Sequence, residues 1–133
     1  MKIDFHNPPN VFTSPSYSHV ASVTGGRTIH VSGQVAFDVE GNVVGKGDMR
    51  AQVRQVYENV AASLAAAGAT FADVVKVNTY VVGLNPGVVA AIREARAPFM
   101  PRSRMPASTM VATPALIHPD LLIEVEVIAC VDA

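Results

Sequence analysis

The sequence is short of charge, of cysteine and of large aromatic side chains. Only 16% of its 133 residues are charged and the formal net charge is −1, while 50% are apolar. A dedicated nucleic-acid binder is therefore not expected, because neutralising phosphates requires clustered lysine and arginine. The apolar runs are far too short to cross a bilayer, so no membrane-spanning segment is expected either.

Cysteine is nearly absent, which limits the chemistry that the chain can support. The lone Cys130 cannot form an internal disulfide, and the sequence contains no CxxC or HExxH spacing that would hold a metal. An acid at Asp4 and the lack of a following apolar stretch argue against a secretory signal. We therefore expect a cytoplasmic protein without a bound metal, folded as one domain over residues 1–133.

Hydrophobic periodicity predicts two helices among several short strands. Asp48 is placed to cap a helix that Gly68 would stop, and Asn85 followed by Pro86 predicts the start of a second helix that ends at Pro98. The segments expected as strands are residues 28–32, 35–37, 74–82, 108–112 and 121–131, with one further strand near Val20. This order predicts an α+β fold in which both helices cover one face of a mostly antiparallel or mixed sheet.

Alternation along the strands predicts two different sheet faces. In residues 121–129 one face carries Ile123, Val125, Val127 and Ala129, and the other carries Leu122, Glu124, Glu126 and Ile128. The first face is purely apolar and suits a core beneath helices. The second is more apolar than a solvated face usually is, with Leu122, Ile128 and Val82. We expect it to pack against other subunits, and the alternative is a solvated face with scattered apolar residues.

Several motifs are spread over almost the whole chain. They are Ser16-Tyr17-Ser18-His19-Val20, Val31-Ser32-Gly33-Gln34, residues 52–59 continuing to Ala66-Ala67-Gly68, residues 73–80, Met105-Pro106-Ala107-Ser108-Thr109, and residues 123–129. In their order and separations these motifs resemble those of the reactive intermediate deaminase family, also called RidA, YjgF or L-PSP endoribonuclease-like.

The resemblance implies a chorismate-mutase-like fold, a homotrimer and ligand clefts between neighbouring subunits. The activity that it implies is hydrolysis of reactive enamines and imines to a carbonyl compound and ammonia, with no cofactor or metal. The ligand would be a small imine, enamine or carboxylic acid. Neither a membrane nor a nucleic acid is an expected partner.

One position departs from the family pattern in a way that affects the chemistry. Deaminase members carry an arginine where this chain has Ser108, and two hydrogen bonds from that arginine can clamp a substrate carboxylate. A serine hydroxyl is neutral and too short to replace it. The cysteine that some members carry two positions later is Met110 here. Arg102 and Arg104, just upstream, are candidate substitutes for the cation, and the alternative is that they are solvated loop charges.

Glu126 is the candidate catalytic residue, because it matches the family carboxylate that positions or activates the hydrolytic water. Its alternative role is a structural ion pair with Lys76 or an arginine. The candidate substrate-binding residues are Tyr17, Ser32, Gly33, Ser108 and Thr109. Tyr17 could instead close a loop, and Gly33 could instead mark a β-bulge.

Two functions remain open from the residues. The first is a divergent imine or enamine deaminase that uses Glu126 and water. The second is a trimeric module that binds or senses a small metabolite without converting it, which the loss of the arginine at Ser108 favours. Arg93 and Arg96 join Arg102 and Arg104 in an arginine-rich stretch, but the stretch lacks interleaved aromatics and is poor evidence for RNA binding.

Overall fold

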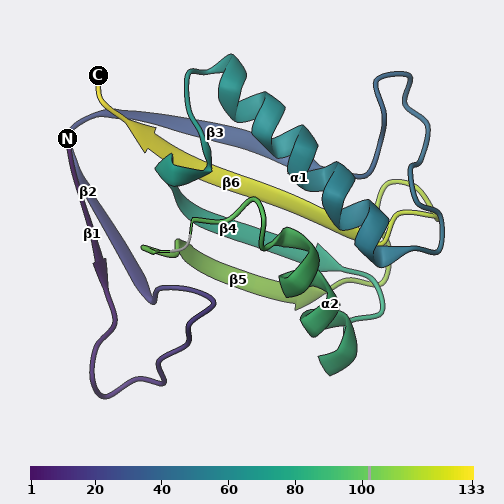
Figure 1. The fold of residues 1–133 in the computed structure, drawn as a ribbon, viewed down its shortest axis with the longest axis horizontal. Helices are drawn as coiled ribbons and strands as arrows, with labels where there is room; N and C mark the ends of the chain where they lie inside the picture. Colours follow the sequence, from purple (N-terminus) through teal and green to yellow (C-terminus); the bar gives the residue numbers. More distant parts are fainter. Residues whose placement is uncertain (102) are drawn as a thin grey trace.

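Two helices cover one face of a four-stranded mixed sheet in the computed structural model, which describes residues 1–101 and 103–133 (Figure 1). The strand order is β3-β6-β4-β5, in which β6 pairs antiparallel with β3 and β4 while β5 runs parallel to β4. The elements are β3 (Arg27–Gln34), α1 (Met49–Ala66), β4 (Val74–Val81), α2 (Pro86–Arg96), β5 (Ala107–Ala112) and β6 (Ile123–Val131), with a short 3-10 turn at Phe71–Asp73. The expected α+β architecture is confirmed.

Both helices begin at the predicted caps. The Asp48 side chain accepts a hydrogen bond from the Ala51 backbone N–H, and the Asn85 side chain accepts one from Val88. These bonds satisfy backbone donors that a helix start leaves free. Gly68 follows α1 with a φ of 78°, a left-handed conformation that a glycine adopts without steric cost.

A separate hairpin forms at the N-terminus. β1 (Lys2–His6) pairs antiparallel with β2 (Val20–Thr24) as a two-stranded sheet of its own. The expected strand near Val20 is therefore confirmed. β1 was not predicted, although the alternation of Lys2, Ile3, Asp4 and Phe5 is a strand signal.

The predicted strand at residues 35–37 is wrong. Gly33 does not end the preceding strand, since β3 continues to Gln34 through a register shift, and this confirms the bulge interpretation. Beyond it, only an isolated bridge joins Phe37 to Val43. The Asp38 carboxylate accepts hydrogen bonds from two backbone N–H groups of this turn, so the chain folds locally instead of extending the sheet.

The helix-facing side of the sheet forms the core. Ile123, Val125, Val127 and Ala129 are each at most 2% exposed, as the alternation of β6 predicts. They pack with the buried valines and Leu64 of α1. No helix in the part of the chain that the structure describes is long and apolar enough to span a membrane.

Gln52 is a fully buried polar residue of α1 that ties the helix to two loops. Its Nε2 donates to the carbonyls of Gly45 (3.1 Å) and Asp120 (2.8 Å), and its Oε1 accepts from the Leu122 N–H at 2.8 Å. These bonds fix the approach to β6, the strand that carries Glu126.

Replacing Gln52 by leucine should therefore destabilise the fold. Gln52→Leu leaves the three backbone groups without this partner, and we expect a loss of about 2–4 kcal/mol in the free energy of unfolding. The measurement is urea unfolding at one fixed protein concentration. Gln55→Leu is the control, because among the described residues the Gln55 amide bonds to Asn59 on the same helix and to no loop. It should cost less than about 1 kcal/mol. Equal losses in the two variants would contradict the role of Gln52.

Candidate functional site

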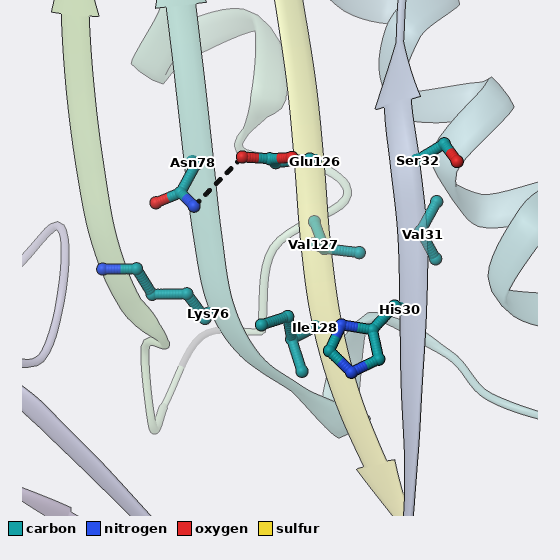
Figure 2. A pocket seen from close by; sticks show the side chains of 8 residues that line it. All are labelled: His30, Val31, Ser32, Lys76, Asn78, Glu126, Val127 and Ile128. Carbon is teal, nitrogen blue, oxygen red and sulfur yellow. Dashed lines mark hydrogen bonds between the residues drawn. The ribbon is translucent and has the colours of Figure 1, made fainter.

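The sheet face opposite the helices carries a pocket of about 280 Å³ (Figure 2). Glu126 on β6 and Asn78 on β4 are register partners, so their side chains lie on the same face. Ser32 reaches the pocket from β3. The residues that line it are His30, Val31, Ser32, Lys76, Asn78, Glu126, Val127 and Ile128. Two of the predicted site residues, Ser32 and Glu126, are thus brought together.

Glu126 is held by neutral donors. Its Oε1 accepts a hydrogen bond from the Asn78 amide at 3.2 Å, drawn in Figure 2, and one from the Tyr80 hydroxyl at 2.7 Å. The alternative role of Glu126, an ion pair with Lys76 or an arginine, is not found among the described residues. Lys76 instead donates to the Thr109 hydroxyl at 3.2 Å. A carboxylate held in this way is oriented without being neutralised by a cation.

Tyr80 is a member of this site that the sequence did not single out. The hydrogen bond to Glu126 is the main cause that raises the pKa of Tyr80 above its ordinary value, and partial desolvation and the charges of Glu126 and Glu124 add to it. Tyr80 therefore stays protonated near neutral pH and acts as a donor. The signal was available, since alternation places Tyr80, Asn78 and Lys76 on one face of β4.

A second group of predicted residues lies on the other face of the sheet. Ser108 on β5 is the register partner of Val77, a core residue, and so faces the helices. It lines a cavity of about 260 Å³ together with Tyr17, Met110, Arg93 and Arg96. Tyr17 and Ser108 therefore lie together, on the opposite face of the sheet from Ser32 and Glu126.

The remaining predicted residues lie beside these two groups. Thr109 lies on the sheet face opposite the helices, which we call the open face. Its hydroxyl accepts a hydrogen bond from Lys76 there. Gly33 lines a third pocket together with Glu124. If residue 33 had a side chain, its Cβ atom would lie only 2.8 Å from the Cδ atom of Glu124. The absence of a side chain at Gly33 therefore lets Glu124 lie directly against the backbone.

Among the described residues, the cations near Ser108 are arginines of α2. Arg102 lies outside the described residues. Arg104 donates to the Ile3 carbonyl at 3.3 Å, and its guanidinium lies 5.2 Å from the centre of the Phe5 ring, so it serves the N-terminal hairpin. Arg93 and Arg96 of α2 line the Ser108 cavity instead. Their spacing of three residues predicts that they share one face of the helix. The spacing does not predict that this face packs beside Ser108, which the structure shows.

No group of three or more histidine, cysteine, aspartate or glutamate side chains in residues 1–101 and 103–133 is arranged to hold a metal ion. The chemistry that the described side chains offer is therefore that of an oriented carboxylate, hydroxyl groups and two guanidinium groups.

Comparison with known sequences shows a family match over most of the chain. The sequence profile of the Endoribonuclease L-PSP family matches residues 10–131. A RutC family protein from Pyrococcus abyssi is 39% identical over 113 residues, which cover 85% of this chain and 84% of the relative. A 2-iminobutanoate/2-iminopropanoate deaminase from Dermatophagoides farinae is 34% identical over 90 residues, covering 65% of this chain and 69% of that protein.

Solved structures agree with the sequence comparison. A Rid family protein of unknown function from Yersinia pestis is 39% identical with a TM-score of 0.88, and the match covers 98% of this chain and 100% of that one. RidA from an Antarctic Psychrobacter species is 28% identical with a TM-score of 0.70, with coverages of 96% and 98%. The fold around both groups of site residues is therefore shared with these proteins.

The contact between Tyr80 and Glu126 predicts a linked titration. Folding raises the pKa of Tyr80, so its hydrogen bond stabilises the folded state fully at pH values below the ordinary tyrosine pKa of 10.0. This stabilisation is lost as the pH rises through the raised pKa, because Tyr80 then loses the proton that it donates. Glu126→Gln removes the negative charge, so we expect the pKa of Tyr80 to fall back toward 10.0. The pKa of Tyr80 is measured from the ultraviolet absorbance of tyrosinate as the pH is raised. The same titration of a Tyr80→Phe variant shows which part of the absorbance change comes from Tyr80.

The matched control for this titration is Glu58→Gln, an exposed glutamate on α1. It should leave the Tyr80 titration unchanged. A Tyr80 titration that Glu126→Gln does not move would contradict the assigned contact.

Proposed function

Because the chain belongs to the Endoribonuclease L-PSP family, in which the Rid and YjgF proteins are found, we propose that it is a divergent imine or enamine deaminase. The observation that carries the proposal is the Glu126 carboxylate, oriented on the open face by Asn78 and Tyr80. The name of the relative from Dermatophagoides farinae, 2-iminobutanoate/2-iminopropanoate deaminase, supports the same reaction class.

The proposed reaction adds water to a carbon–nitrogen double bond. Glu126 Oε1 takes both hydrogen bonds from its protein neighbours, and Oε2 is the atom that we assign to the water. Glu126 accepts a proton as the water oxygen bonds to the carbon of the protonated imine, which gives a carbinolamine with a neutral amino group. Glu126 then returns this proton to the nitrogen. As the carbon–nitrogen bond breaks, the carbinolamine hydroxyl gives up its proton, and the products are a carbonyl compound and ammonia that carries the proton of the original iminium.

The proposed site is completed by a second subunit. Glu126 and Ser32 lie on the open face, whereas Tyr17 and Ser108 lie on the helix face, so one chain does not bring them into one cavity. We propose a homotrimer, the assembly typical of the family, in which the open face packs against a neighbour. The half-buried Leu122, Ile128 and Val82 supply apolar contact area for this packing. Tyr17, Ser32, Gly33, Ser108 and Thr109 are the proposed substrate-binding residues.

A second candidate function is a trimeric module that binds a small metabolite without turning it over. The observation that favours it is Ser108, which stands where the deaminase members of the resembled family carry an arginine. Met110 likewise stands where some members carry a cysteine. In either case we propose that the protein works in the cytoplasm on small molecules.

Release of ammonia tests the proposed reaction. Imines generated in situ by an amino-acid oxidase should decay to ammonia faster with the protein than without it. Glu126→Gln should lower kcat/KM by about 10²–10⁴, the usual loss when a positioned proton-transfer group is removed. Glu58→Gln, an exposed change of the same kind on α1, should not affect the rate. Equal decay with and without protein, for acidic and neutral imines alike, would overturn the catalytic proposal in favour of the binding module.

The oligomeric state tests the proposed assembly. Ile128→Asp places a charge on the open face and should disrupt the packing of subunits. Light scattering should then give the mass of a single chain, about 14.0 kDa, whereas the wild type should give three times that mass. Ala90→Asp, on the exposed part of α2, is the control and should remain trimeric. A wild-type protein that is monomeric at all concentrations would refute the proposed trimer.

A further inference from the structure

Ser18 ties the loop that carries Tyr17 to the start of β5. The Ser18 N–H donates to the Pro106 carbonyl at 3.0 Å, and the Ser18 hydroxyl donates to the Met105 carbonyl at 2.5 Å. Ser18 is 5% exposed and also forms an isolated bridge to Ala107. A buried donor is costly to leave without a partner, so these bonds fix how the two distant segments meet.

Arg96 of α2 holds the same loop from the other side of Tyr17. Only 4% of Arg96 is exposed, and its Nη2 donates to the Ser16 carbonyl at 3.3 Å. No carboxylate among the described residues forms an ion pair with Arg96. Its place in the last turn of α2 accounts for a positive charge, because helix C-terminal carbonyls attract cations, but does not account for the bond to a residue 80 positions earlier.

The ring of Tyr17 is held as well as its neighbours in the chain. The Tyr17 and His19 rings meet edge to face, with centroids 5.3 Å apart and 80° between the planes. His19 is itself fixed, since its backbone N–H donates to the Asn7 side chain at 3.0 Å and its Nε2 donates to the Phe12 carbonyl. None of these contacts uses the Tyr17 hydroxyl, so they leave it to a molecule in the cavity that Tyr17 and Ser108 line.

We propose that Arg96 and Ser18 are positioning residues, which set the place of the Tyr17 hydroxyl relative to Ser108. Ser18 is bonded to the residues just before Ser108, so one segment carries the serine and anchors the tyrosine loop. Arg96 supplies the second fixed point, on Ser16. A polar group that is held in advance loses less freedom when a ligand binds, which favours binding.

This inference rests on the proposed function, in which Tyr17 binds the substrate, and deepens it by naming two residues that act through Tyr17. Neither Arg96 nor Ser18 needs to touch the substrate for this role. Their effect on binding passes through one hydroxyl group, and a double-mutant cycle detects such a dependence.

Amide hydrogen exchange of the full-length protein, followed by NMR, tests whether the loop is held. In Arg96→Gln the Ser18 N–H should exchange at least about tenfold faster, because a loop that loses a fixed point opens more often. The Val82 N–H, which donates to the Leu122 carbonyl at 2.9 Å, should exchange as it does in the wild type. Equal acceleration at Ser18 and Val82 would show a general loss of stability and contradict the positioning role.

Two further variants complete the exchange experiment. Ser18→Ala removes only the hydroxyl and should accelerate the same exchange, so it decides the question if Arg96→Gln does not fold. Arg93→Gln is the matched control, since Arg93 lies three residues before Arg96 on α2 but is exposed, and it should leave the exchange unchanged. Unchanged Ser18 exchange in either folded test variant would overturn the proposal, whether or not the protein releases ammonia.

Kinetics of ammonia release test whether Arg96 acts through Tyr17. Tyr17→Phe and Arg96→Gln should each raise KM about three- to tenfold, the effect of losing one hydrogen bond to the substrate, with kcat little changed. The double variant should raise KM no further than Tyr17→Phe alone. Effects on KM that multiply in the double variant would overturn the positioning role. A wild type that releases no ammonia would refute the deaminase, and the exchange experiment would then decide the positioning role by itself.

Discussion

The pairing of β4 with both of its neighbours decides which side chains in this protein can meet. β4 places Asn78 opposite Glu126 of β6, and it places Val77 opposite Ser108 of β5. Since successive residues of a strand point to opposite faces, these two registers send the carboxylate to the open face and the serine to the helix face. A one-residue shift of β6 would turn the Glu126 charge into the core, and a one-residue shift of β5 would turn Ser108 to the open face.

This constraint explains why the open face combines charged and apolar residues. On β6 the residues that the helices cover are isoleucine, valine and alanine, so both glutamates of the strand fall on the other side. There Glu126 lies two residues from Ile128 on the same strand face, and the Asn78 and Tyr80 donors hold it in place. Apolar contact area and an oriented carboxylate on one surface suit a face that packs against a neighbour and also lines a cleft.

The sequence predicts the parts of the fold that depend on local rules. The caps at Asp48 and Asn85 satisfy backbone donors nearby, and the alternation of β6 needs only the strand period. Local rules did not distinguish a strand break from a bulge at Gly33, because both use the same residue and differ only in the pairing with β6. They also left β1 unassigned, since a five-residue strand gains its stability from its partner β2.

The candidate site was predictable only where its residues share one strand pair. Glu126 was identified from its motif, and its neighbours on β4 follow from alternation, although the register that joins Asn78 to Glu126 does not. Arg93 and Arg96 lie beside Ser108 because α2 packs near β5. This contact joins segments that are distant in the sequence, so no local sequence pattern predicts it. Proximity in sequence pointed to Arg104, but that side chain extends to Phe5 and Ile3, far away along the chain.

The serine at position 108 and the arginines of α2 form a consistent set. An arginine at Ser108 would place a third cation in a cavity of about 260 Å³ that already holds Arg93 and Arg96, and like charges at such distances repel. A small hydroxyl avoids that repulsion. Serine at this position is therefore compatible with two helix-borne cations in the same cavity, and it leaves the sheet that positions Glu126 unaltered.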